Sequence, residues 1–122
     1  MKHLLLVVAL LITSFSITAQ IKKSTVQITK EISKGIPKED NLTIKFVGPT
    51  KQPVKRGVKM IANNDTIFPE ISDLGIYKDH LEPGTYKLNF SFPYWYDATI
   101  EKLKCNKNET IHITVFFNPK DI

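Results

Sequence analysis

The stretch that decides the fold is LEPGTYKLNFSFPYW, residues 81–95. Pro83 presets the backbone angle that the first corner of a tight turn needs, and Gly84 is expected to supply the positive φ of the second corner. After this turn large apolar side chains stand at every second position: Tyr86, Leu88, Phe90 and Phe92. A period of two is that of a strand with one face on a core and the other in water. The stretch therefore predicts a turn that leads into a long, half-buried strand.

The same alternation recurs from residue 41 to residue 117. Short apolar runs are separated by turn-forming residues such as Gly48-Pro49, Asn63-Asn64-Asp65 and Asn118-Pro119. The other strands expected cover residues 42–47, 57–62, 66–68, 76–77, 98–103 and 110–117. Short strands spaced about ten residues apart, without a convincing helix, are typical of an all-β sandwich or small barrel. We expect an all-β, seven-stranded antiparallel Greek-key β-sandwich of the prealbumin or immunoglobulin-like kind.

Residues 1–19 have the layout of a secretory signal peptide. A positive start at Lys2 precedes an apolar run over residues 4–12, and a more polar stretch ends at the small residue Ala19. The apolar run is too short for a membrane span, which needs about 20 strongly apolar residues. We expect cleavage between Ala19 and Gln20 and export to the periplasm, the cell envelope or the cell exterior. No membrane span is expected after cleavage.

Removing residues 1–19 from the 122 leaves 103, which suits one domain with one core. Residues 20–40 are expected to form an N-terminal extension or linker, and residues 41–122 the β-sandwich domain. Within the extension, alternation at Val26 and Ile28 favours a short edge strand. The spacing of Ile28, Ile32 and Ile36 favours a helix, and the two patterns fit about equally well.

Charge and cysteine content restrict the partners. The formal net charge of +5 falls to +4 once Lys2 is removed, and the remaining lysines are dispersed along the chain. A nucleic-acid partner is not expected, because it would need a localised basic patch. Cys105 is the single cysteine, so no intramolecular disulfide can form. It is expected to be a small buried side chain, the alternative being a bond to another molecule.

Three segments carry a family resemblance: residues 57–60 (GVKM), 72–77 (SDLGIY) and 81–88 (LEPGTYKL). They resemble the carboxypeptidase regulatory-like domains, whose pattern is a small-residue strand, a T-D-x-x-G-x-[FY] turn and an L-x-P-G-x-Y-x-L strand. The resemblance covers residues 41–117, although the turn is one residue shorter here and Pro93-Tyr94-Trp95 replaces the usual Gly-Tyr. It implies a transthyretin-like (prealbumin-like) sandwich, usually a non-catalytic module of secreted and envelope proteins in bacteria.

The enzymes built on related scaffolds can be tested on single residues. A zinc carboxypeptidase needs a His-x-x-Glu pair, but neither His80 nor His112 is followed three residues later by Glu. Transthyretin-like hydrolases end in Tyr-Arg-Gly-Ser, whereas this chain ends in FNPKDI. Residues 79–82 (DHLE) hold three potential metal ligands, yet neighbours on an extended chain point to opposite faces. We expect no metal, no cofactor and no catalysis. The alternative is a hydrolase on a transthyretin-like scaffold with an unrecognised active site.

The aromatic corner after the long strand is the candidate binding site. Aromatic rings beside a carboxylate can stack on sugar rings and hydrogen-bond to their hydroxyl groups, and Tyr and Trp are enriched at protein interfaces. The alternative is a structural role, in which Trp95 closes the end of the sandwich. We expect an exported binding module whose partner is an unknown envelope protein or a glycan. The residues expected to hold this partner are Tyr94, Trp95, Tyr96 and Asp97.

Overall fold

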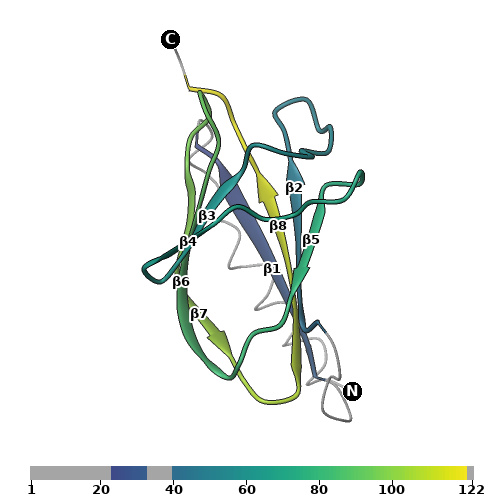
Figure 1. Ribbon diagram of the computed structural model, residues 1–122, viewed down its shortest axis with the longest axis vertical. Coiled ribbons are helices and arrows are strands. Elements are labelled where there is room, and N and C mark those ends of the chain that lie inside the picture. Colours follow the sequence, from purple (N-terminus) through teal and green to yellow (C-terminus); the bar gives the residue numbers. More distant parts are fainter. Residues whose placement is uncertain (1–22, 33–39, 121–122) are drawn as a thin grey trace, which may run out of the picture.

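A computed structural model describes residues 23–32 and 40–120, which form two facing β-sheets. The first sheet has the order β1-β8-β2-β5 and the second the order β4-β3-β6-β7 (Figure 1). The expectation of an all-β protein with two stacked sheets is confirmed. The predicted signal peptide lies outside the described residues. The strands are β1 (Thr25–Ile32), β2 (Leu42–Val47), β3 (Lys59–Ala62), β4 (Asp65–Ile67), β5 (Ile76–Asp79), β6 (Gly84–Ser91), β7 (Ala98–Cys105) and β8 (Glu109–Phe116).

Alternation along the strands places one face of each sheet in a shared core. In β6, Leu88 and Phe90 are buried, Asn89 between them is half-buried, and Lys87 before them is exposed. Phe90 meets Phe46 of the opposite sheet edge to face, with ring centroids 5.6 Å apart, a favourable aromatic geometry. The inward faces expected for residues 42–47, 85–92 and 110–117 are confirmed. The most buried large side chains are Leu42, Ile44, Phe46, Leu88, Phe90, Leu103, Ile111, Ile113, Val115 and Phe117.

One pair of neighbouring strands is parallel. β2 pairs with β8 in parallel, from Leu42 opposite Ile111 to Val47 opposite Phe116. The other described strand pairs are antiparallel. The expectation of an entirely antiparallel sandwich is wrong at this pair. Alternation determines which face of a strand is buried, but it carries no information on the direction of the neighbouring strand.

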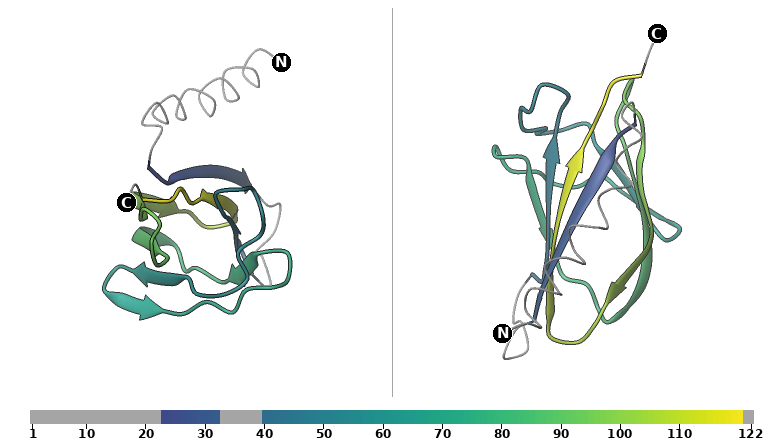
Figure 2. Two further views of the ribbon diagram at one scale, coloured as in Figure 1. Left: turned by 90° about the horizontal axis from the view of Figure 1, so that it is seen from above. Right: turned by 180° about the vertical axis from the view of Figure 1, so that it is seen from behind.

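β1 is the segment in which the helix and strand patterns fitted equally well. It pairs with β8 over its whole length, from Thr25 opposite Phe116 to Ile32 opposite Glu109, and Val26 packs against the core. The strand forms because β8 supplies partners for the backbone groups of β1. With β1 the described residues contain eight strands, one more than expected. Figure 2 shows β1 beside β8 at the surface when the molecule is seen from behind.

The connection from β5 to β6 differs from the turn expected at Pro83-Gly84. Gly84 is the first residue of β6, pairs with Cys105 and has no positive φ. The connection is held instead by the buried side chain of Asn41, which precedes β2. Its Oδ1 accepts the N–H of Leu81 (2.7 Å) and its Nδ2 donates to the Leu81 carbonyl oxygen (2.8 Å). The predicted tight turn is therefore wrong, because a side chain distant in sequence satisfies the backbone there.

Candidate binding surfaces

The aromatic corner joins β6 to β7. Pro93 and Tyr94 are the central residues of a turn that the Trp95 N–H closes onto the Phe92 carbonyl oxygen (3.1 Å). Tyr94 has a φ of 68° and is 77% exposed. A left-handed backbone is costly for a bulky L-residue and easy for glycine. The Tyr94 carbonyl oxygen accepts the N–H of Lys120 (3.0 Å), so the C-terminal segment holds the corner. The corner thus displays one exposed aromatic ring on a strained backbone.

Trp95 points into the sandwich rather than into solvent. Its ring stacks on Phe92 with centroids 4.0 Å apart and an interplanar angle of 20°, and its centroid lies 5.5 Å from that of Phe117. The side chain is half-buried, and its backbone forms a bridge with Pro119. This arrangement matches the structural alternative, in which Trp95 closes one end of the core.

Tyr96 ties the corner to both ends of the described chain. Its N–H donates to the Asn118 carbonyl oxygen (2.9 Å), and its own carbonyl oxygen accepts the Ser24 hydroxyl (2.6 Å). The residue is half-buried. These contacts use its backbone, and they anchor the segment before β1 against the segment before β7.

Asp97 lies directly before β7 and contacts Asn89 of β6 in the second sheet. Its Oδ2 accepts the Nδ2 of Asn89 (3.4 Å), and the Asn89 Oδ1 accepts the Thr99 hydroxyl (2.6 Å). Asn89 and Thr99 line a hollow of about 320 Å³ whose other polar groups include Lys87 and Glu101, paired at 3.6 Å. The carboxylate of Asp97 thus contacts a polar side chain of the sheet. The structure places the four predicted residues in different surroundings and does not gather them around one ligand position.

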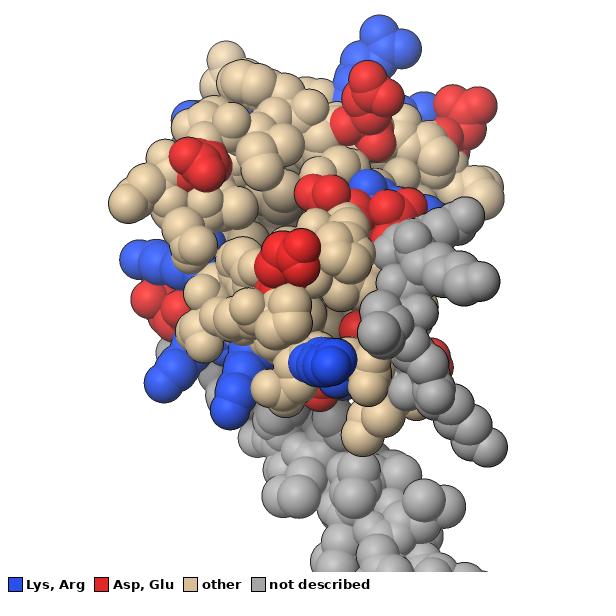
Figure 3. Space-filling view, turned by 60° about the horizontal axis from the view of Figure 1, so that its bottom comes forward, with Lys and Arg blue, Asp and Glu red and all other residues tan. Residues whose placement is uncertain are grey.

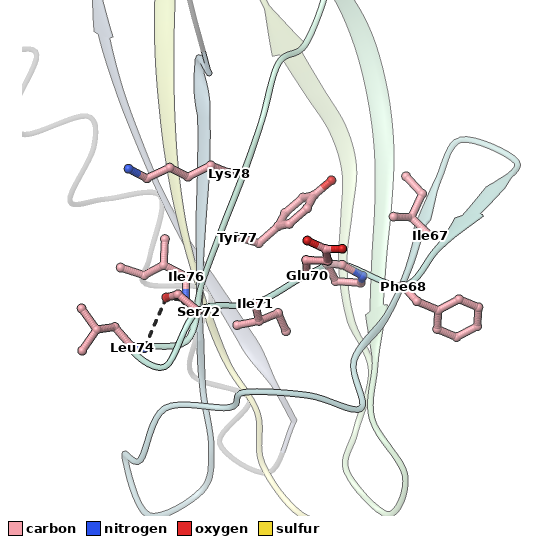
Figure 4. A pocket seen from close by; sticks show the side chains of 10 residues that line it. Ile67, Phe68, Glu70, Ile71, Ser72, Leu74, Ile76, Tyr77 and Lys78 are labelled. Atoms are coloured by element: carbon pink, nitrogen blue, oxygen red, sulfur yellow. Dashed lines mark hydrogen bonds between the residues drawn. The ribbon is translucent and has the colours of Figure 1, made fainter.

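A large hollow in the described part of the chain was not expected from the sequence. It lies between β4 and β5, one edge strand from each sheet, and has a volume of about 800 Å³. Phe68 and Leu74 are at its two ends and are 74% and 68% exposed (Figure 4). Figure 4 shows the Tyr77 ring directed across the hollow towards the side of Ile67. We call this surface the β4–β5 groove; its lining is Ile67, Phe68, Pro69, Glu70, Ile71, Ser72, Leu74, Ile76, Tyr77 and Lys78.

Ser72 gives the groove a defined end. Its N–H donates to the Ile76 carbonyl oxygen (2.9 Å), while its hydroxyl oxygen accepts the N–H groups of Leu74 (3.2 Å) and Ile76 (3.3 Å). Gly75, with a φ of 80°, completes this loop by donating its N–H to the Ser72 carbonyl oxygen (2.9 Å). Serine side chains commonly stabilise turns in this way. The exposed Leu74 is therefore presented by a hydrogen-bonded loop.

Tyr77 places a polar atom beside the apolar lining. Its hydroxyl donates to Asp79 Oδ2 (2.7 Å), and the other carboxylate oxygen accepts the N–H of His80 (2.7 Å). Burial of the ring, then the hydrogen bond to Asp79 and its negative charge, raise the pKa of the Tyr77 hydroxyl. The hydroxyl therefore stays protonated and fixes the ring across the groove.

The end of the molecule with the β5–β6 and β7–β8 connections carries mixed charges. Figure 3 shows basic and acidic side chains interspersed there. His80 Nε2 lies 3.7 Å from Glu82 Oε2, and Asp79 is engaged by Tyr77. Among the residues that the structure describes, no three His, Cys, Asp or Glu side chains are close enough together to hold a metal ion.

Cys105 lies at the same end, inside the core. The residue is 2% exposed, and its Sγ lies 4.0 Å from the Nδ2 of Asn41. Desolvation, with a smaller contribution from the charge of Glu109, raises the pKa of the thiol. The expectation of a buried cysteine is confirmed. A buried thiol of raised pKa is a poor nucleophile.

Comparison with known proteins gives no family assignment. No family model matches the chain, and no curated protein matches it significantly. Within residues 23–32 and 40–120, no helix has the length and apolar character needed to cross a membrane.

Proposed function

We propose that the protein is an exported, non-catalytic β-sandwich of a bacterial cell envelope that binds a protein partner through the β4–β5 groove. The observation that carries this proposal is the pair of large apolar side chains, Phe68 and Leu74, exposed at the ends of one groove. Large apolar side chains that are exposed around one hollow are candidates for contact with a partner. Tyr77 adds the kind of ring that is common at protein interfaces.

The composition of the groove favours a protein partner over a glycan. Ile67, Ile71 and Tyr77 give it an apolar interior, which fits the apolar side chains of a partner segment. A glycan would fit better in the hollow on the outer face of the second sheet. There Asn89, Thr99 and nearby amides can form hydrogen bonds with hydroxyl groups. Carbohydrate binding at that polar hollow is the second candidate function.

Export and family are parts of the same proposal. The layout of residues 1–19 supports a signal peptide cleaved after Ala19. The two-sheet sandwich agrees with a prealbumin-like Greek-key domain of the carboxypeptidase regulatory-like kind, which the segments 72–77 and 81–88 suggest. Mass spectrometry of the chain recovered from the cell envelope is expected to find Gln20 as the first residue. A chain that retains residues 1–19 in the cytoplasm would contradict export.

Site-specific photo-crosslinking in intact cells tests the groove. A photoreactive residue replaces Phe68 in one variant, Tyr94 at the corner in a second, and the exposed Lys55 in a third as the background control. We expect one protein to be captured from position 68 but not from positions 94 and 55. The captured protein, once purified, is expected to bind the Leu74→Asp variant at least about tenfold more weakly, a loss of about 1.4 kcal/mol.

Each other result has a defined meaning. Capture from position 94 alone would move the site to the aromatic corner and contradict the groove. Equal capture from positions 68 and 55 would mean that the groove has no preferred protein partner. Unchanged affinity of Leu74→Asp for the captured protein would also exclude the groove as the contact surface.

A further inference from the structure

β1 has one backbone edge that faces β8 and one that faces no described strand. It is the outermost strand of its sheet, and its ladder is made with β8. It runs for eight residues in unbroken register, without proline. A regular edge strand of this length is a template for another strand.

The hydrogen bonding of β8 determines which backbone groups of β1 point outward. The Ile111 N–H donates to the Asn41 carbonyl oxygen (2.8 Å). Directly after β8, the Phe117 N–H donates to the Val47 carbonyl oxygen (2.9 Å). The backbone N–H and C=O groups of the odd-numbered residues in 109–117 thus point towards β2. Those of the even-numbered residues point towards β1, where they pair with residues 25, 27, 29 and 31. The outward N–H and C=O groups of β1 consequently belong to Val26, Ile28, Lys30 and Ile32.

The other edge strands are less able to accept a partner. β4 has three residues and β5 has four, and the outward backbone groups of Ile76 in β5 are already bonded to Ser72. The β6–β7 ladder shifts register between Tyr86 and Leu88, and the edge carbonyl of Lys104 in β7 accepts the ammonium of Lys30. Short, irregular or occupied edges resist strand addition. β1 is therefore the most open edge of the described sandwich.

We propose that two copies of the chain associate by antiparallel pairing of β1 with β1, about a twofold axis that passes through Thr29. Residue i then lies opposite residue 58 − i of the second copy. This register pairs Val26 with Ile32 and Ile28 with Lys30, so all four outward residues form hydrogen-bonded pairs. A twofold pairing uses the same strand on both copies, as most homodimers do.

The side chains agree with this register. Ile32 is 83% exposed in the single chain and would gain an apolar neighbour in Val26 of the second copy. Glu31 would lie opposite Gln27, so no like charges are opposed, whereas shifting the axis to residue 30 would oppose Lys30 with itself. The Lys30 ammonium is directed across its own sandwich to Lys104 and lies 3.9 Å from Glu109. Its charge is therefore compensated within each copy.

Disulfide trapping tests the register. On the axis, Thr29 faces its own counterpart in a pair whose Cα atoms are about 4.5 Å apart, within the range that a disulfide spans. The Thr29 side chain is exposed, and the native Cys105 is buried. Under mild oxidation we expect the exported Thr29→Cys chain to form a covalent dimer at least about tenfold faster than Gln27→Cys, whose thiol would face residue 31.

Sedimentation velocity tests the association itself. We expect the apparent mass of the unmodified chain to rise towards that of two copies as concentration increases. Ile32→Lys, which replaces the exposed apolar side chain opposite Val26 by a charged one, should weaken association at least tenfold. Thr66→Pro, a proline on the outer side of β4 in the other sheet, should leave it unchanged. A chain that stays monomeric at every concentration overturns the proposal. So does a dimer in which Gln27→Cys is trapped as fast as Thr29→Cys, because the axis would then lie elsewhere.

Discussion

Tyr94 has a backbone conformation that suits glycine. Replacing it by glycine removes a left-handed penalty of about 1–2 kcal/mol, partly offset by about 0.5–1 kcal/mol of extra chain entropy in the unfolded state. Because the ring is 77% exposed, little packing is lost. We expect Tyr94→Gly to raise the free energy of unfolding by about 0.5–1 kcal/mol in urea titrations.

Tyr94→Ala is the matched control, since it removes the same ring but keeps the Cβ. It is expected to leave stability close to that of the unmodified protein. If Tyr94→Gly were the less stable of the two variants, the ring or the turn would make contacts that outweigh the strain.

Trp95 is the single tryptophan, so its fluorescence reports one position. We expect a blue-shifted emission that is weakly quenched by iodide, because the ring stacks on Phe92 and lies beside Phe117. Trp95→Ala should cost about 2–4 kcal/mol of stability, and the ring-preserving Trp95→Phe less than about 1.5 kcal/mol. Red-shifted, readily quenched emission together with unchanged stability of Trp95→Ala would make Trp95 a surface contact.

At the scale of single elements, the sequence predicted strands where apolar and polar residues alternate over a long stretch. Where the alternation was short, it did not decide between strand and helix. β6 and β8 alternate over eight residues each, and their inward faces were predicted correctly. β1 carries the same alternation at Val26 and Ile28, but helical spacing competed, and the partner that decides between them lies more than 75 residues away in β8. The connection before β6 was mispredicted for the same reason, since Asn41 holds it from a distance.

β5 has a tyrosine whose ionisation is linked to folding. In the folded state the pKa of Tyr77 is raised. The protonated hydroxyl therefore stabilises the fold at pH values below its ordinary pKa of about 10, and this stabilisation is lost as the pH rises above that value. We expect stability to fall above about pH 10, and less steeply in Tyr77→Phe. The pKa of Tyr86 is also raised, mainly by burial, so some dependence should remain.

At neutral pH, Tyr77→Phe should cost about 1–2 kcal/mol, because the Asp79 carboxylate loses a hydrogen bond. The exposed Tyr94→Phe is the control and should leave the urea midpoint at neutral pH unchanged. An unaltered alkaline profile in Tyr77→Phe would assign the pH dependence to other groups.

At the scale of the whole molecule, the number of sheets followed from the sequence but their arrangement did not. The alternation of apolar and polar residues identifies the inward face of each strand, but it does not determine strand order or direction. The parallel β2–β8 pair therefore could not be inferred. The β4–β5 groove arises where two edge strands of different sheets approach each other. Its one local signal was Phe68, a large apolar residue directly before Pro69, which ends the strand and leaves the ring outside the core.

The same limitation applies to the boundary expected at residue 41. β1 satisfies the even-numbered backbone groups of β8, and Val26 and Ile28 pack against the core. A chain that begins at Asp40 would expose this edge of a central strand and the apolar surface that β1 covers. We expect it to lose at least about 3 kcal/mol of stability or to fail to fold, whereas a chain that begins at Lys23 keeps the full urea midpoint. If both chains unfolded at the same denaturant concentration, residues 41–122 would be a self-sufficient domain and β1 an appended strand. A large difference would instead make β1 part of the folding unit, because β8 needs hydrogen-bonding partners on both sides.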